Sequence, residues 1–231
     1  MSCLEHLTPA TEAEAVAVQE RLRTRVDTVG PGPTPGAPGT VVGVDVAYDD
    51  DRGVVAAAAV ALEVPSLAVV ATATAVGPVS FPYVPGLLAF RELPTVLEAL
   101  DRLDAPCDLV VCDGYGLAHP RRLGLASHLG VLTGLPTVGV AKNPFVFRHP
   151  PLAPHRGAQA PLLDGEGAEA EEVGRALRTR DGVKPVYVSV GHRVSLDNAC
   201  AHTLVLTGRY RLPETTRRAD ALCRRALREA V

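Results

Sequence analysis

The chain has 231 residues, 47% of them apolar, which suits one domain with a core large enough to fold without disulfide staples. Taken as a sum, the net charge of −3 argues against a nucleic-acid partner, and the start, Met1–Leu7, lacks the basic and apolar regions of a signal peptide. Five cysteines form no Cys-x-x-Cys pair, as is usual in reduced proteins. We therefore expect one cytoplasmic domain over residues 1–231, monomeric and without a membrane segment.

The N-terminal region, residues 1–39, is predicted to hold one helix and a surface loop. The helix runs from about Thr8 to Val26, with Thr8 as its cap and with Glu12 and Glu14 opposing the helix dipole in the first turn. Residues 30–39 alternate glycine and proline so densely that they can form neither a helix nor a central strand.

The rest of the chain alternates between strand and helix patterns, which indicates an α/β fold. Three β-rich runs come first and are joined by connections short enough only for antiparallel hairpins. The strands are expected at 40–48, 53–63, 67–76, 107–112, 137–141 and 185–190, and the helices at 85–103, 122–133, 195–206 and 213–229.

Residues 144–183 interrupt this alternation. The segment begins with several prolines and continues with Asp164-Gly165-Glu166-Gly167. Such a composition predicts a long flexible loop or flap, with one helical turn at 171–178.

Three carboxylates stand in apolar surroundings. Asp113 ends the run 107–112 and precedes Gly114, Asp45 lies inside the first β-rich run, and Glu92 lies on the apolar stripe of the 85–103 helix. Magnesium takes hard oxygen ligands from a few carboxylates and keeps several waters, so the three acids together suggest a metal site. Asp113 on its own could equally serve a structural ion pair.

The charge distribution adds a second signal. No acid lies between Asp113 and Asp164, whereas five basic residues do, and seven arginines lie between Arg209 and Arg228. This segregation fits a phosphate-binding face on an acidic protein, and it fits a set of solvated helix faces equally well. Arg121 and Arg122 lie at the start of a predicted helix, where their charge and the free amides could meet one phosphate backbone.

The order of elements, three antiparallel strands, a helix and then a strand that pairs in parallel with the first, indicates a ribonuclease H-like fold with a mixed central sheet. Four ordered motifs then closely resemble those of the endonuclease V family. They are Phe81-Pro82-Tyr83-Val84-Pro85-Gly86-Leu87-Leu88-Ala89-Phe90-Arg91-Glu92, Asp113-Gly114-Tyr115-Gly116-Leu117-Ala118-His119-Pro120-Arg121, Gly139-Val140-Ala141-Lys142 and Lys184-Pro185-Val186-Tyr187-Val188-Ser189-Val190-Gly191-His192-Arg193.

The resemblance implies a magnesium-dependent DNA repair endonuclease, with manganese as a substitute, that recognises deoxyinosine and hydrolyses a phosphodiester bond on its 3′ side. It implies that Asp45, Glu92 and Asp113 bind the metal. His119 and Lys142 would support catalysis, and the carboxylate of Asp220 would stand in the outer shell of the metal.

Each supporting residue also has a structural interpretation. His119 could be a loop histidine with its hydrogen bonds satisfied, and Asp220 could be a plain i,i+4 partner of Arg224. Lys142 is harder to explain in this way, because 21 of the 23 basic residues are Arg and lysine occurs only at 142 and 184. A compact ammonium suits a position against a phosphate.

The first motif suggests how a lesion is reached. Pro82 and Pro85 flank Tyr83 and stiffen the loop, so Tyr83 could act as a wedge between bases, or it could cap the core together with Phe81. The resemblance favours the wedge. It further implies that a flipped hypoxanthine meets the backbone of a glycine-rich pocket. The pocket residues are Gly86, Leu88, Gly114 and Gly116.

Two alternatives remain for the function. One is an endoribonuclease for inosine in RNA, because no residue clearly tests for a 2′-hydroxyl. The other is a non-catalytic protein that binds inosine or branched DNA, although such a module would have no need of clustered acids beside a phosphate. Two departures from the family pattern are the proline-rich segment after Lys142 and Val190 in place of a proline.

Overall fold

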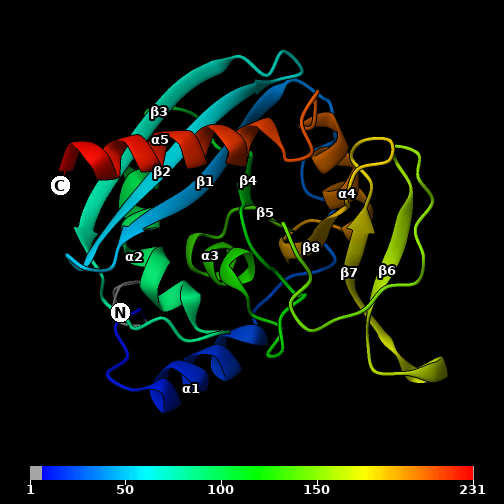
Figure 1. Ribbon diagram of the computed structural model, residues 1–231, viewed down its shortest axis with the longest axis horizontal. Helices are drawn as coiled ribbons and strands as arrows, with labels where there is room; N and C mark the ends of the chain where they lie inside the picture. The colour runs from blue at the N-terminus through cyan, green and yellow to red at the C-terminus, as the bar shows by residue number, and fades with distance from the viewer. Residues whose placement is uncertain (1–6, 231) are drawn as a thin grey trace.

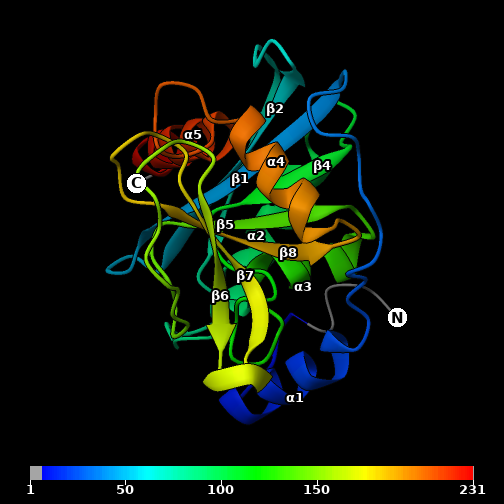
Figure 2. The same cartoon turned by 90° about the vertical axis from the view of Figure 1, so that its right-hand side faces the viewer.

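The computed structural model describes residues 7–230. Residues 1–6, which include Cys3 and most of the segment judged not to be a signal peptide, lie outside that range. The described chain forms an eight-stranded mixed sheet with helices on both faces (Figures 1 and 2). None of the helices within residues 7–230 is long and apolar enough to cross a membrane.

The N-terminal helix α1 (Glu12–Arg23) begins later and ends earlier than predicted. Its cap is Thr11, whose side chain accepts a hydrogen bond of 3.2 Å from the amide of Glu14. The carboxylate of Glu14 in turn accepts one of 2.8 Å from the amide of Ala10. This Thr-x-x-Glu pair satisfies two free backbone donors, which explains why Thr8 is not the cap.

The first half of the sheet is the predicted antiparallel meander. It consists of β1 (Gly39–Asp49), β2 (Val54–Val64) and β3 (Val69–Pro78). Strand β4 (Leu109–Cys112) then pairs in parallel with β1. This arrangement confirms the expected ribonuclease H-like order of the first four strands.

The second half of the sheet corrects the expectation for residues 144–183. Strand β5 (Thr137–Ala141) is followed by β6 (Gln159–Asp164), a short 3₁₀ turn (Gly167–Glu169) and β7 (Glu171–Leu177), and β8 (Val186–His192) pairs with both β5 and β7. The helical turn expected at 171–178 is thus a strand. Pro161 is tolerated within β6 because β6 is an edge strand.

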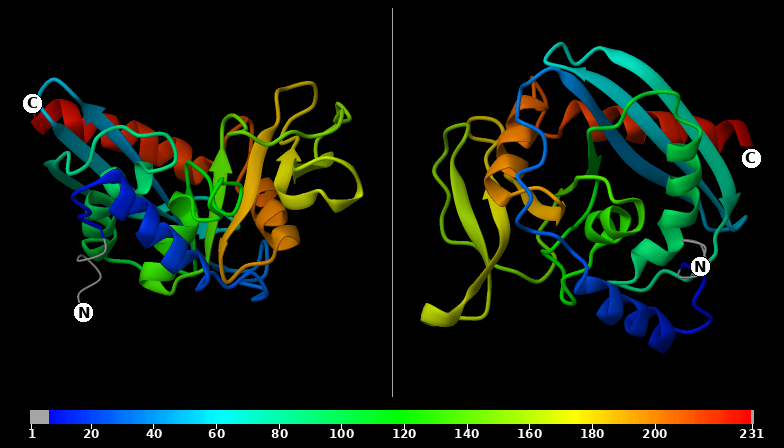
Figure 3. Two further views of the ribbon diagram at one scale, coloured as in Figure 1. Left: turned by 90° about the horizontal axis from the view of Figure 1, so that it is seen from below. Right: turned by 180° about the vertical axis from the view of Figure 1, so that it is seen from behind.

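The helices form a layer on each face of the sheet. Helix α5 (Glu214–Ala230) crosses β1 and β2 on one face, and α2 (Leu88–Asp101) and α3 (Leu125–Thr133) cover the other (Figures 1 and 3). Helix α4 (Leu196–Val205) packs against β8. Because both faces of β2 are covered, its central residues are small and fully buried.

Helix α2 contains Pro94, which has no amide to donate to the carbonyl of Phe90. The hydroxyl of Ser80 donates to that carbonyl instead, at 3.1 Å. Helix α2 therefore continues through Pro94, and it carries Glu92 on its buried side.

Two glycines allow the close contacts on which the site depends. A Cβ on Gly43 of β1 would lie 2.3 Å from the carbonyl carbon of Thr215, so the start of α5 rests directly on the β1 backbone. A Cβ on Gly139 of β5 would lie 2.6 Å from the amide nitrogen of Gly116, so the loop after β4 rests on β5. Any larger side chain would displace backbone at either position.

Candidate active site

Asp45, inside β1, lies close to Asp113 and Lys142, which directly follow β4 and β5. Val44 of β1 lies opposite Cys112 of β4 in the parallel register, so the following residues, Asp45 and Asp113, are neighbours. Lys142 directly follows β5, and its ammonium forms an ion pair with the carboxylate of Asp113. Parallel strands place their carboxyl ends at one edge of a sheet, which explains the meeting of these residues.

The ionised form of Asp45 is strongly disfavoured by its surroundings. Its Oδ1 accepts a hydrogen bond of 2.8 Å from the amide of Val46, while its buried Oδ2 has no hydrogen-bond partner within residues 7–230. Burial, and then the charge of Asp113, raise the pKa of Asp45 to about 8. A buried carboxylate oxygen without a donor is costly unless a proton or a cation accompanies it.

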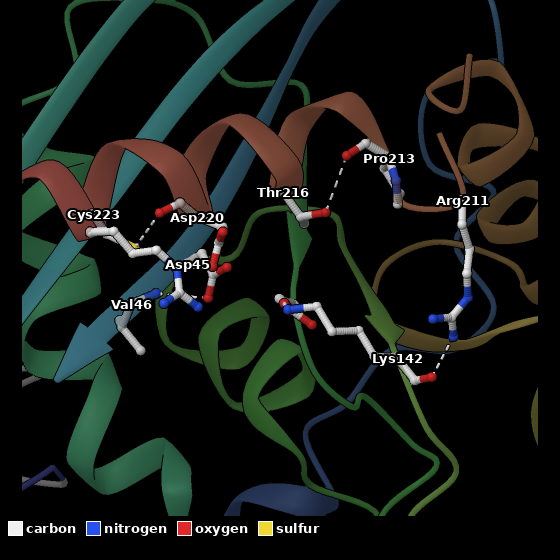
Figure 4. Close-up of polar contacts among 10 residues, drawn as sticks. Asp45, Val46, Lys142, Arg211, Pro213, Thr216, Asp220 and Cys223 are labelled. Atoms are coloured by element: carbon white, nitrogen blue, oxygen red, sulfur yellow. Dashed lines mark hydrogen bonds and ion pairs between the residues drawn. The ribbon is translucent and has the colours of Figure 1, made fainter. Parts of the chain in front are cut away.

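Asp220 faces this carboxylate from helix α5 (Figure 4). Its charge makes a smaller contribution to raising the pKa of Asp45. The carboxylate of Asp220 also accepts a hydrogen bond of 2.8 Å from Nε of Arg224, four residues further along the helix. The two interpretations of Asp220 are therefore compatible, since it is a helix ion-pair partner that lies beside the site.

Glu92 approaches from the opposite face of β1. Val44 packs in the core against α2, and strand alternation puts Tyr48 on the same face, away from Asp45. The hydroxyl of Tyr48 donates a hydrogen bond of 2.6 Å to Oε1 of Glu92. Burial raises the pKa of Glu92 to about 7; the Tyr48 bond opposes this shift and the charge of Asp113 adds to it.

The three expected carboxylates differ in their contacts. Asp45 and Asp113 are adjacent, whereas Glu92 is held by Tyr48, and no three His, Cys, Asp or Glu side chains in the described part of the chain gather closely enough to hold one ion. The donors of the adjacent pair are hard oxygens, and one of them lacks a partner. Both properties fit a divalent cation that keeps part of its water shell.

A cavity opens beside the acids. Glu92 and Asp113 lie in its wall, and Gly86, Leu88 and Gly114 line it as expected. Gly116 does not line it. A Cβ on that residue would lie 2.0 Å from the carbonyl oxygen of Val190, so Gly116 is required for packing against β8.

One wall of the cavity is fixed by three donors to the carbonyl oxygen of Gly86. They are the side chains of Gln19, His119 and Arg121, at 2.9, 3.0 and 2.8 Å. The other ring nitrogen of His119 accepts from the amide of Arg121 at 3.2 Å, and burial followed by the nearby Arg121 charge lowers the pKa of His119 to about 4. His119 is therefore a neutral loop histidine in the cavity wall, with both ring nitrogens bonded to backbone groups.

Arg121 and Arg122 are not arranged as a phosphate grip at a helix start. Arg121 is held by Gln19 and Gly86, as described above. Nη2 of Arg122 lies 2.6 Å from Asp164 and 2.6 Å from Glu171. Helix α3 begins only at Leu125, and the charge of Arg122 is matched by the two acids of the β6–β7 hairpin.

Tyr83 and Phe81 have different surroundings. The ring of Phe81 is 5% exposed and packs 5.8 Å from the ring of Phe90. The side chain of Tyr83 is 67% exposed, between the exposed Pro82 and Pro85. Phe81 alone caps the core, and Tyr83 is presented to solvent on a proline-stiffened loop.

Sequence reasoning missed three residues that organise the site. Gln19 is a polar residue on the buried stripe of α1, between Ala15 and Leu22, and this position is a signal that could have been followed. Tyr48 could have been assigned to the Glu92 face from strand alternation. Arg211, which donates to the backbone carbonyl of Lys142 (Figure 4), has no signal in the local sequence.

Comparison with known proteins agrees with this geometry. The family model of endonuclease V matches residues 20–221. Endonuclease V of Streptomyces coelicolor is 73% identical over 222 residues, covering 96% of this chain and 93% of that protein. The crystal structure of endonuclease V from Streptomyces avermitilis is 71% identical and superposes with a TM-score of 0.92, with 96% of each chain covered.

More distant relatives share the fold across the same length. The catalytic domain of human endonuclease V is 35% identical, with a TM-score of 0.84 over 96% of this chain and 98% of that one. Endonuclease V of Ciona intestinalis, solved with a 24-mer DNA containing an inosine followed by a ribo-adenosine, is 28% identical, with a TM-score of 0.79 over 95% and 98% of the two chains. On these matches, the chain belongs to the endonuclease V family.

Proposed function

We propose that this protein is a magnesium-dependent repair endonuclease that cleaves DNA on the 3′ side of deoxyinosine. The observation that carries the proposal is the adjacent pair Asp45 and Asp113: Asp45 has a buried oxygen without a hydrogen-bond partner in residues 7–230, and Asp113 lies in the wall of a cavity. Membership of a phosphodiester-hydrolysing family supports it, as does the inosine-containing DNA bound by the Ciona relative.

Asp45 and Asp113 would hold the magnesium ion, with manganese as a substitute, and Asp220 would stand outside them. When bound, the ion supplies positive charge that polarises a phosphoryl oxygen and makes water a stronger nucleophile near neutral pH. Its charge would also compensate the unpartnered oxygen of Asp45 and the repulsion between the two carboxylates.

Lys142 and Glu92 would supply the remaining charge and proton transfer. Burial lowers the pKa of Lys142, but its hydrogen bond to Asp113 and the charge of that residue raise it by more, so Lys142 stays cationic and can face the scissile phosphate. Glu92 has a pKa of about 7, which suits a group that exchanges a proton with water near neutrality. Attack of water on phosphorus releases a 3′-hydroxyl and leaves a 5′-phosphate.

The cavity would receive the flipped base. Gly86 and Gly114 lack side chains there, so a flat hypoxanthine could approach the backbone closely, with Leu88 against it. Tyr83, exposed beside Pro82, would fill the gap in the duplex that the flipped nucleotide leaves.

We propose a monomer that works in the cytoplasm. The location in the cytoplasm is supported by the cysteines. Cys107, Cys112, Cys200 and Cys223 are all free, and three of them are buried. Free buried thiols are usual where glutathione and thioredoxin keep cysteines reduced.

The decisive experiment uses matched DNA and RNA strands that carry one inosine or one adenosine at the same position. With magnesium, we expect cleavage of the inosine-containing DNA on the 3′ side and none with EDTA. Cleavage that does not depend on inosine would overturn the proposal. Faster cleavage of the RNA strand would show that the preferred substrate is inosine in RNA. Binding without cleavage would favour the non-catalytic alternative.

A further inference from the structure

Five arginines around the β7–β8 connection form no ion pair with an acidic side chain in residues 7–230. Their guanidinium groups bond to backbone carbonyls or stack on a tyrosine, and within residues 7–230 none forms an ion pair with a carboxylate. Arg122 and Arg175 behave differently, since each pairs with two acids. The five are Arg156, Arg178, Arg180, Arg209 and Arg211.

Two of them join neighbouring loops and remain exposed. Nη2 of Arg156 donates to the carbonyls of Leu204 and Thr207, at 2.8 and 3.0 Å. Nη1 of Arg180 donates to the carbonyl of Arg209. Both side chains line an open surface cavity in which Asp181 is the one acid. Carbonyls fix the guanidinium groups in place without cancelling their charge.

Arg209 is oriented by an aromatic ring. Its guanidinium lies 4.8 Å from the ring centroid of Tyr210, and that of Arg217 lies 4.4 Å from the same centroid. Arg217 pairs with Glu214 at 2.6 Å, whereas Arg209 is exposed and has no acidic partner in the described chain. Stacking on a ring limits the freedom of a guanidinium but leaves its N–H groups open to a ligand. We call Arg156, Arg180, Arg209 and Tyr210 the arginine surface.

The arginine surface is connected to the active site through Arg211. Nη2 of this residue donates to the backbone carbonyl of Lys142 and to that of Pro185, the latter at 2.8 Å. The side chain of Lys142 extends away from Arg211 (Figure 4). Its ammonium forms an ion pair with Asp113. Asp113 borders the base cavity. These contacts link the cavity and the acids through Lys142 to Arg211, which follows Tyr210 of the arginine surface in the chain.

We propose that the arginine surface binds the phosphodiester backbone of the cleaved strand beyond the scissile bond, on the 3′ side of the inosine. This inference rests on the proposed function, which puts the inosine in the cavity and the scissile phosphate at the acids. A strand that continues past Lys142 then meets guanidinium groups that are oriented, exposed and unmatched, and phosphate oxygens suit their fork of donors.

The test measures affinity against the length of the 3′ flank. Single strands carry inosine near a labelled 5′ end and either about two or about ten nucleotides after it, and binding is followed by anisotropy in EDTA. The double variant Arg180→Ala/Arg209→Ala is compared with Arg102→Ala/Arg225→Ala, which removes two exposed arginines that pair with acids elsewhere. A charge-conserving variant, Arg180→Lys/Arg209→Lys, completes the set.

We expect the wild-type protein to bind the long flank more tightly than the short one. The Ala variant should lose roughly ten- to thirtyfold on the long flank, with a log–log salt slope shallower by about 1.4, because each phosphate contact on a single strand contributes about 0.7. The Lys variant should recover most of this slope, and the control pair should keep it.

An unchanged gain with flank length in the Ala variant would overturn the inference. An equal loss on both lengths would do the same, because the arginines would then act on the site or the fold. Failure of the proposed function would give a different result, namely wild-type protein that does not discriminate inosine from adenosine in any strand. In that case a fall in affinity of the Ala variant for plain strands would still support the anion-binding surface.

Discussion

Lys142 and Asp113 form an ion pair between the ends of the parallel strands β5 and β4, with Lys142 42% exposed and Asp113 15% exposed. Asp113 raises the pKa of Asp45, whereas Lys142 lowers it. Lys142 therefore offsets part of the negative charge of the site while its ammonium remains open to a substrate. A lysine fixed by one carboxylate and exposed on its other side is well placed to meet a phosphate.

We expect Lys142→Met to reduce kcat by about 10²–10³, because the oriented positive charge is lost where negative charge develops. Lys184→Met is the matched control, since Lys184 is the other lysine of the chain and bonds to Asn143 at 2.6 Å. Single-turnover cleavage of an inosine-containing strand measures both variants. A Lys142→Met rate close to that of Lys184→Met would remove Lys142 from the mechanism.

The carboxylates should separate into two classes. Asp45→Asn and Asp113→Asn should lose Mn²⁺ affinity by at least about tenfold together with cleavage, because they remove a direct ligand. Glu92→Gln should lose cleavage while it keeps most of its Mn²⁺ affinity, because Glu92 lies on the other face of β1. Titration followed by electron paramagnetic resonance gives the affinities. Asp104→Asn, an exposed acid, is the control.

Equal loss of Mn²⁺ affinity in all three site variants would show that all three carboxylates bind the ion. Cleavage by Asp113→Asn at the rate of Asp104→Asn would contradict the assignment of the metal site altogether.

Asp45 should make a contribution that lowers the stability of the metal-free protein as the pH rises from about 4 to about 8. The pKa of Asp45 is raised from 3.8 to about 8, so between these values the folded state keeps a proton that the unfolded state releases. The stabilisation is complete below the unfolded pKa and is lost as the pH passes the folded one. Thermal melts in EDTA measure this contribution as the difference between wild type and Asp45→Asn, because Glu92 and His119 also titrate over this range and are common to both proteins.

Added Mn²⁺ should reverse the trend above pH 7, because the ion requires the ionised carboxylate. A metal-free Tm that rises over the same pH range in the wild type, but not in Asp45→Asn, would contradict the raised pKa.

Tyr83→Ala should weaken discrimination between inosine-containing and normal duplex more than it slows cleavage of inosine in a single strand. Stacking on an aromatic ring contributes about 1–3 kcal/mol, and only the duplex must be opened. Tyr83→Phe keeps the ring and should behave like the wild type. Comparable losses on duplex and single strand would show that Tyr83 supports the pocket rather than the opening of the duplex.

Gln19→Met should raise KM for an inosine-containing strand more than it lowers kcat. The substitution preserves length but removes the donors to Gly86 and Leu123, which lie on two walls of the cavity. The Gly86 carbonyl keeps its bonds from His119 and Arg121, whereas the buried Leu123 carbonyl loses its side-chain donor, which also costs about 1–3 kcal/mol of stability. Gln159→Met, at an exposed strand position, is the control for both measurements.

A Gln19→Met variant that loses stability but keeps the wild-type KM would show that α1 supports the fold without shaping the pocket.

The sequence was informative where the signal is local. Strand alternation, helical periodicity and glycine–proline segments located the meander, α2, β4, β5 and α5. Asp45, Asp113 and Lys142 could be assigned to one edge of the sheet, because parallel strands bring their carboxyl ends together whatever the loops between them do. The motifs that pointed to the family were equally local, and the comparisons confirm the family.

Tertiary structure alone decided what those residues touch. Residues 159–177 form a hairpin that pairs with β8 through β7. The sequence of this edge hairpin has no regular alternation of apolar and polar residues from which that pairing could be predicted. The packing of α2 across the sheet places Glu92 where the hydroxyl of Tyr48 donates to it, and Oδ2 of Asp45 has no hydrogen-bond partner within residues 7–230. Likewise, contacts with residues far along the chain bound His119 to Gly86 and Arg122 to two acids. Such contacts depend on where elements distant in the chain meet, and no local periodicity records that.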